Sequence, residues 1–73
     1  MVRIVGSSNV LAVGYEPWTR EMRIAFWNKY GPPSLYSYPN IPAAIHAGLM
    51  SAGSKGSYVQ YVIRRQYPGY RIG

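Results

Sequence analysis

The segment Met22–Trp27, MRIAFW, alternates between two sets of side chains. Met22, Ile24 and Phe26 share one face of a strand, because successive side chains of a strand point to opposite sides. The apolar run Val10–Tyr15, VLAVGY, predicts a strand before it, and the intervening EPWTRE segment is typical of a turn. The sequence therefore predicts an antiparallel β-hairpin.

A third strand is predicted at Leu35–Tyr38, where Pro39 ends it. The preceding segment NKYGPPS, residues 28–34, predicts a loop, because two consecutive prolines cannot donate hydrogen bonds to a neighbouring strand. The third strand is expected to be short and to lie at an edge of the sheet.

A first helix is predicted after the strands. Asn40 is its expected N-cap, and Pro42 suits the first turn, where a missing N–H group costs nothing. Ile45 and Leu49 recur at helical spacing, up to Met50, and mark the face that should be buried.

A second helix is predicted over Tyr58–Gln66. Ser57 and Gln60 are three residues apart, as the two members of a capping box are at the start of a helix. Val59 and Ile63 mark the side of this helix that is expected to lie nearer the core.

Strands followed by helices are typical of the α+β class. The sequence predicts a single domain over residues 1–73, with a three-stranded antiparallel meander followed by two short helices packed on one face. Residues 1–8 form either an extended arm, which pairs with a sheet edge in this fold or on a partner, or a frayed end. Residues 67–73 are expected to form a tail.

The composition argues against several classes of protein. The chain has no cysteine, one histidine and two acidic residues, so disulfides and a metal site are not expected. No second histidine or cysteine accompanies His46, and no serine has a base beside it in the pattern of a nucleophile, so no catalysis, cofactor or small-molecule substrate is expected. No apolar run approaches the roughly 20 residues of a membrane span, and no signal peptide is evident, so a cytoplasmic location is expected.

Positive charge dominates the sequence. Eight Lys and Arg residues face two acidic ones, which gives a net charge of +6, and six of the eight are Arg. Such an excess favours binding to a polyanion or an acidic protein surface, although solubility alone is an alternative explanation. The residues expected to bind a partner are Arg3, Lys55, Tyr58, Tyr61, Arg64, Arg65, Tyr67 and Arg71.

Most of these residues belong to one C-terminal cluster. Tyr58, Tyr61 and Arg65 fall on one face of the predicted second helix, so cations and rings can interleave there. A structural alternative exists for Arg64 and Arg65, because cations near a helix C-terminus are stabilised by the helix dipole.

Tyr36 and Tyr38 are two residues apart, so both rings project from the same face of the predicted third strand. They form either a stacking platform for a ligand or one wall of the core. The core interpretation is favoured, because large rings are scarce in so small a domain.

Several short motifs occur in an order that resembles the KTSC domain family, named for its occurrence at the C-terminus of some lysyl-tRNA synthetases. The resemblance extends from about Ser7 to Tyr70. The motifs are Ser7-Ser8-Asn9, Val13-Gly14-Tyr15, Tyr36-Ser37-Tyr38-Pro39, Ser54-Lys55-Gly56-Ser57-Tyr58, Ile63-Arg64 and Tyr67. The resemblance implies a small bacterial or phage domain, stand-alone or appended, for which RNA binding has been suggested without a defined site. One departure is visible: the longer segment WNKYGPPSL replaces the tight, glycine-bearing turn usual before Y-x-Y.

Two functions are therefore expected as alternatives. In size and charge the chain is similar to short phage proteins that bind host RNA polymerase, which implies a non-enzymatic regulator that inhibits initiation or alters pausing or termination. The alternative is a sequence-tolerant RNA-binding module, because Arg and Tyr side chains suit both protein and RNA surfaces. No membrane role is expected.

Overall fold

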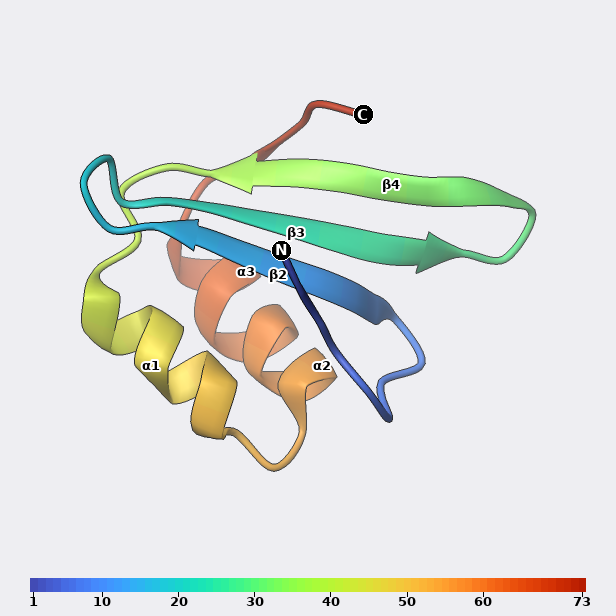
Figure 1. The fold of residues 1–73 in the computed structure, drawn as a ribbon, viewed down its shortest axis with the longest axis horizontal. Coiled ribbons are helices and arrows are strands. Elements are labelled where there is room, and N and C mark those ends of the chain that lie inside the picture. The colour runs from blue at the N-terminus through green and yellow to red at the C-terminus, as the bar shows by residue number, and fades with distance from the viewer.

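The computed structural model describes residues 1–73 as one antiparallel sheet with two helical segments packed on one of its faces (Figure 1). The strands lie in the order of the sequence, and they are β1 (Val2–Arg3), β2 (Val10–Glu16), β3 (Glu21–Asn28), β4 (Gly31–Tyr38) and β5 (Tyr70–Arg71). The helical elements are α1 (Ala43–Ser51), α2 (Lys55–Tyr58), η1 (Val59–Ile63) and α3 (Arg64–Gln66), and the last three run on without a break. The predicted α+β class is confirmed.

The predicted number of strands is wrong, because both ends of the chain join the sheet. Arg3 of β1 pairs with Ala12, and Arg71 of β5 pairs with Tyr36, both in antiparallel register. The N-terminal arm therefore pairs within its own fold, and the predicted C-terminal tail contains a strand. Strands of two residues are too short to show the alternation from which strands are predicted.

The predicted loop over residues 28–34 is also wrong in its second half. β4 begins at Gly31 and includes both prolines. The N–H group of Leu35 donates to the carbonyl of Gly73 at 3.2 Å, so the peptide groups of Leu35 point away from β3. Residues two apart along a strand direct their peptide groups to the same side. The missing N–H group of Pro33 would therefore point away from β3, where no hydrogen-bond donor is needed.

Pro32 lies at an irregularity in the ladder. The register of β3 and β4 shifts between Phe26 and Asn28, and the Asn28 side-chain amide donates to the Pro32 carbonyl at 2.7 Å. A proline is tolerated at such a bulge, because the regular ladder is interrupted there.

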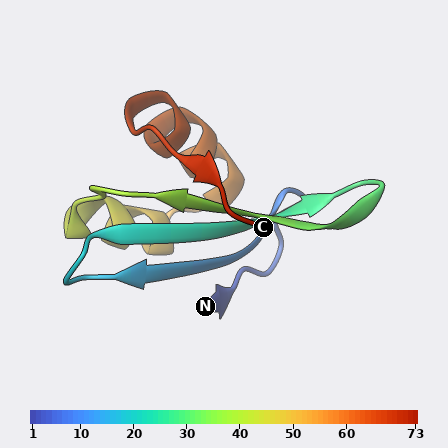
Figure 2. The same ribbon diagram turned by 90° about the horizontal axis from the view of Figure 1, so that it is seen from above.

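The connection between β3 and β4 is short. Asn28 pairs with Gly31, so only Lys29 and Tyr30 form the turn. The expectation of a longer connection in place of a tight turn is therefore wrong, since most of that segment is strand. Tyr30 is 91% exposed at the tip, and this end of the hairpin projects beyond the helices (Figures 1 and 2).

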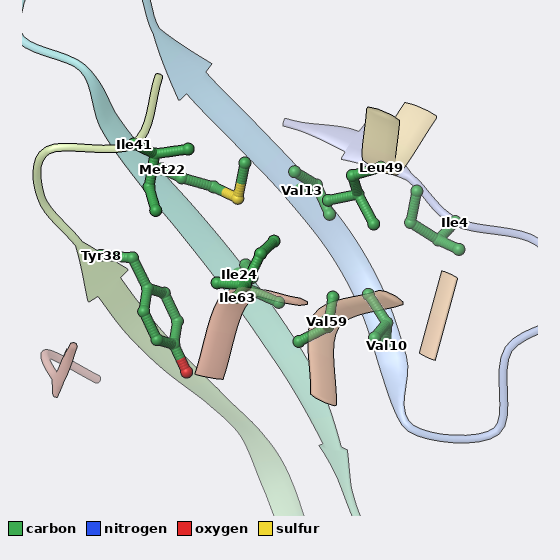
Figure 3. Packing of buried hydrophobic residues seen from close by; sticks show 10 residues of the cluster. All are labelled: Ile4, Val10, Val13, Met22, Ile24, Tyr38, Ile41, Leu49, Val59 and Ile63. Carbon is green, nitrogen blue, oxygen red and sulfur yellow. The ribbon is translucent and has the colours of Figure 1, made fainter. Parts of the chain in front are cut away.

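The core lies between the sheet and the helices (Figure 3). Met22 and Ile24 from β3 are fully buried, as their alternation predicted, while Leu49 comes from α1 and Ile63 from η1. Both helical segments therefore cover the same face of the sheet. The other face carries no helix and is called the open face below. No helix has the length and apolar character that a membrane crossing requires.

The first helix begins later than predicted. Pro42, and not Asn40, is the N-cap residue, and no side chain caps this helix. Asn40 instead has a φ of 61°, a conformation that asparagine tolerates better than most residues. The N–H group of Ile41 donates to the carbonyl of Arg20 at 2.9 Å, which ties this reversal of the chain to the β2–β3 turn.

The second helical segment begins earlier than predicted. The Ser54 hydroxyl accepts from the N–H group of Ser57 at 3.3 Å, so Ser54 is the cap and the predicted Ser57 capping box is wrong. The N–H group of Arg64 bonds to the carbonyl of Val59, five residues earlier, which makes η1 a turn of π-helix. The extra residue shifts the side chains that follow by one position, about 100° around the axis.

Candidate functional site

The residues expected to bind a partner do not form one surface. Lys55 is half-buried, and its ammonium group donates to the carbonyl of Ala52 at 3.0 Å across the loop between the helices. The Tyr58 hydroxyl donates to the carbonyl of Ile45 at 3.0 Å. Lys55 and Tyr58 therefore hold the two helices together, and they do not share an exposed face with Arg65.

The π-helical turn explains why the predicted helical face is not formed. The prediction placed Tyr58, Tyr61 and Arg65 together on the assumption of an uninterrupted α-helix. Tyr58 lies before the extra residue and points toward α1, whereas Tyr61 is 55% exposed. The Arg65 guanidinium lies over the Tyr61 ring at 5.3 Å, so this pair alone of the predicted face stays together.

Two other predicted residues are separate from this pair. Tyr67 is half-buried and packs against the core. Arg3 lies opposite Ala12, which alternates with the buried Val13, so Arg3 is on the open face. Tyr67 therefore contributes to the core at the end of the second helical segment, and Arg3 lies on the opposite face of the sheet.

A cleft lies where the β3–β4 hairpin passes the second helical segment. It encloses about 250 Å³. Its lining residues are Asn9, Phe26, Trp27, Asn28, Ser34, Tyr36, Tyr38 and Arg64, and this set is called the aromatic cleft below.

The rings of the aromatic cleft are in mutual contact. Tyr36 and Phe26 meet edge to face, with centroids 5.6 Å apart, and Tyr36 and Tyr38 lie nearly parallel at 6.4 Å. Tyr38 is only 4% exposed and belongs to the core, while Tyr36 is half-buried. The two tyrosines therefore differ in role: Tyr38 is a core residue, whereas Tyr36 is partly exposed and lines the cleft.

Arginine side chains flank these rings. The guanidinium of Arg64 lies over the Phe26 ring at 5.9 Å. Arg71 pairs in register with Tyr36, so its side chain lies on the same face of the sheet. Arg64, Arg71 and Tyr36 therefore lie on the same side of the sheet, although they were predicted to belong to two unrelated sites.

The polar wall of the cleft was missed by the sequence analysis. The Asn28 side-chain amide donates to the Ser34 hydroxyl at 2.6 Å, and Ser34 is 6% exposed. Both residues fall in the segment predicted as a loop, and Phe26 was assigned to the core face alone. Only the contact between two strands brings these side chains together, so no local pattern could have indicated the site.

The two carboxylates lie on the other side of the sheet. Glu21 is two residues from Arg23 on the same face, bonds to it at 3.3 Å, and lies opposite Glu16 in the β2–β3 register. Met22, which lies between Glu21 and Arg23 in the sequence, is fully buried on the covered face. Glu21, and Glu16 opposite it, are therefore on the open face. A hydrogen bond from the Ser37 hydroxyl, followed by one from Arg23, lowers the pKa of Glu21.

Charge and burial act against each other at Tyr38. Burial raises the pKa of the Tyr38 hydroxyl, because it disfavours the phenolate, while the nearby positive charge of Arg64 opposes the rise. Tyr38 therefore stays neutral at physiological pH and acts as a core side chain with a polar edge.

Two of the short motifs meet at the start of the second helical segment. The Ser7 hydroxyl accepts from the N–H group of Val10 at 3.0 Å and donates to the Asn9 side chain at 2.9 Å. A Cβ atom at Gly56 would meet the side-chain oxygen of Asn9 at 2.5 Å, so a larger residue there would displace the Asn9 side chain. Ser7-Ser8-Asn9 thus shapes the entry to β2, and Gly56 allows the helix to approach it.

The fold and the cleft define a small α+β domain with an antiparallel sheet, helices on one face and a cleft of aromatic and polar side chains at the sheet's covered side. The KTSC domain family model matches residues 6–67, and the chain therefore belongs to the KTSC domain family. The crystal structure of a KTSC domain protein from Yersinia pestis is similar, with a TM-score of 0.83 and 34% identity over 100% of this chain and 97% of that chain. No curated protein matches the chain significantly.

Proposed function

We propose that the chain is a small non-enzymatic binding protein that acts on bacterial transcription by binding RNA polymerase. The observation that carries this proposal is the separation of charge. Both carboxylates lie on the open face, whereas Arg64, Arg65 and Arg71 lie on the helical side and make no ion pair with either of them. Such a side attracts an acidic protein surface and orients it before contact.

The exposed part of this side has the composition of an interface. Tyr61 is 55% exposed beside Arg65, and Tyr and Arg are the residue types enriched where binding energy concentrates. The size and charge of the chain, which are similar to those of short phage regulators of host polymerase, support this choice of partner. Bound there, the protein would inhibit initiation or alter pausing or termination.

The test is binding of the purified chain to purified bacterial RNA polymerase at moderate salt. Arg65→Glu should weaken the complex strongly, because it places a negative charge in the contact. Arg3→Glu makes the same change of charge on the open face and should bind nearly as the unaltered chain does. Absence of binding by the unaltered chain would refute the proposal.

RNA binding is a second candidate, favoured by the aromatic cleft, where an Arg guanidinium and a half-buried Tyr lie together. It predicts an affinity for RNA that falls steeply with salt as phosphate contacts are lost. A pull-down from bacterial lysate, with and without nuclease, separates the candidates. RNA polymerase that stays bound after nuclease treatment supports the first candidate. Bound material that is lost after nuclease treatment supports the second.

A further inference from the structure

We propose that the aromatic cleft binds a single unpaired nucleotide, with the base against Tyr36 and the phosphate at Arg64. The inference is independent of polymerase binding and specifies where the second candidate function would act. It rests on the size of the cleft, on its unused hydrogen-bonding groups and on the distribution of charge around it.

The size of the cleft limits the ligand. Its volume of about 250 Å³ is below the roughly 300–1,000 Å³ usual for drug-sized ligands. A cavity of this size holds one base and leaves the sugar and phosphate at its mouth. Because the β3–β4 hairpin projects beyond the helices, a strand of nucleic acid can continue past the cleft along that end of the sheet (Figures 1 and 2).

The polar wall has hydrogen-bonding capacity left over. The Asn28 amide donates both of its hydrogens, one to the Pro32 carbonyl and one to the Ser34 hydroxyl, which leaves its carbonyl oxygen as an acceptor. The Ser34 hydroxyl accepts from Asn28 and keeps its own hydrogen to donate. Two lining residues that contact each other therefore retain one acceptor and one donor between them.

Every nucleobase presents a donor beside an acceptor on its pairing edge. The pair formed by Asn28 and Ser34 can bond to that edge only when the base is unpaired. An apolar side chain from a protein partner would instead leave both groups desolvated without partners, which is unfavourable. The polar wall therefore favours a nucleotide over a hydrophobic anchor of a protein.

The charge at the mouth of the cleft suits a phosphate. Arg64 lies over Phe26, and Arg71 lies on the same face of the sheet as Tyr36. Arg71 does not line the cleft, and its Nε atom donates to a main-chain oxygen of Gly73 at 2.9 Å, so Arg64 is the cation that lies at the cleft itself. Both carboxylates are on the opposite face, so no negative charge of a side chain opposes a phosphate here.

The test compares two neighbouring arginines of equal charge. Binding of a fluorescent eight-nucleotide oligoadenylate RNA is measured by anisotropy at several salt concentrations. Arg64→Gln should weaken binding about tenfold and reduce the salt slope by about 1, as expected for a lost phosphate contact. Arg65→Gln removes the same charge one residue away, toward Tyr61, and should change affinity less than about twofold, because this residue does not line the cleft.

Ser34→Ala tests the polar wall without changing the charge, and it should also weaken binding while far-ultraviolet circular dichroism stays unchanged. Adenosine monophosphate is the second probe. Binding of the mononucleotide with shifts of the Phe26 and Tyr36 ring resonances supports the site and identifies free nucleotide as a ligand. Binding of the oligonucleotide alone, with the same shifts, supports the site and identifies a strand. Equal losses for Arg64→Gln and Arg65→Gln, or no binding at low salt, would overturn the proposal.

Discussion

The side chain of Tyr58 lies directly against Gly48, where it joins the second helical segment to α1. A Cβ atom on Gly48 would overlap the Tyr58 hydroxyl, which donates a hydrogen bond to the carbonyl of Ile45. This contact explains why a tyrosine expected to bind a partner has a structural role. It also makes the spacing of the helices sensitive to a single methyl group.

Gly48→Ala is expected to destabilise the protein by about 1–3 kcal/mol, because the added methyl group forces the tyrosine or the helix to move. Gly53→Ala is the matched control. A Cβ atom at Gly53 meets nothing within 4 Å, so this change should stay within about 0.5 kcal/mol. Urea unfolding of both variants measures the difference, and equal stabilities would contradict the packing described.

Acid should destabilise the protein through Glu21. The Ser37 hydroxyl and Arg23 hold the pKa of Glu21 below its usual value in the folded chain. A carboxylate with a lowered folded-state pKa contributes stability above its unfolded pKa and loses it as pH falls through the folded pKa. Glu21→Gln should therefore flatten the acid side of the stability profile. Thermal unfolding followed from pH 7 to pH 2 tests this, and curves that stay parallel would refute it.

The sequence predicted the elements whose side chains alternate or recur over several turns. Met22 and Ile24 were placed correctly because a half-buried strand must alternate, and Val59 and Ile63 because a packed helix has a buried face. Strands β1 and β5 were missed because each has only two residues and therefore shows no alternation of its own. These residues are extended because they pair with the edge of the sheet. Pro33 was predicted to lie in a loop, because the sequence alone does not show which side of the strand its peptide groups face. That side is known only from the register of β3 and β4.

The candidate site was predicted only in parts. Arg64 and Tyr36 were both singled out, but they were assigned to separate sites 28 residues apart in the sequence. The π-helical turn before Arg64 changes the direction of the side chains after it, and no residue type in the sequence predicts such a turn. Asn28 and Ser34 become neighbours only through the register of β3 and β4.

The pairing of the N-terminal arm gives a further prediction. Ile4 is 6% exposed within the core, although the residues on either side of it are exposed. Ile4→Ala should therefore cost about 2–5 kcal/mol, as large-to-small changes in a core do. Val5→Ala, at a side chain that is 90% exposed, should cost less than about 0.5 kcal/mol. Equal effects of the two changes would mean that the arm is frayed in solution.

The two tyrosines of the Y-x-Y motif should separate stability from binding. Tyr38 is 4% exposed, so Tyr38→Ala should cost about 3–5 kcal/mol, as the loss of a buried large aromatic ring does. A domain of this length has a total stability of roughly 4–11 kcal/mol, so this variant should be largely unfolded on mild heating.

Tyr36→Ala removes a half-buried ring and should leave most molecules folded, while it removes the surface against which a base would stack. Base stacking on an aromatic side chain is worth about 1–3 kcal/mol, so binding of the eight-nucleotide RNA should fall by about fivefold to more than a hundredfold. Circular dichroism melts and anisotropy titrations on both variants decide the matter. If Tyr36→Ala unfolds the chain as readily as Tyr38→Ala, both rings are core residues, and the platform role of Tyr36 is wrong. If it stays folded and binds RNA as before, stacking on Tyr36 makes no contribution, and the nucleotide must bind elsewhere.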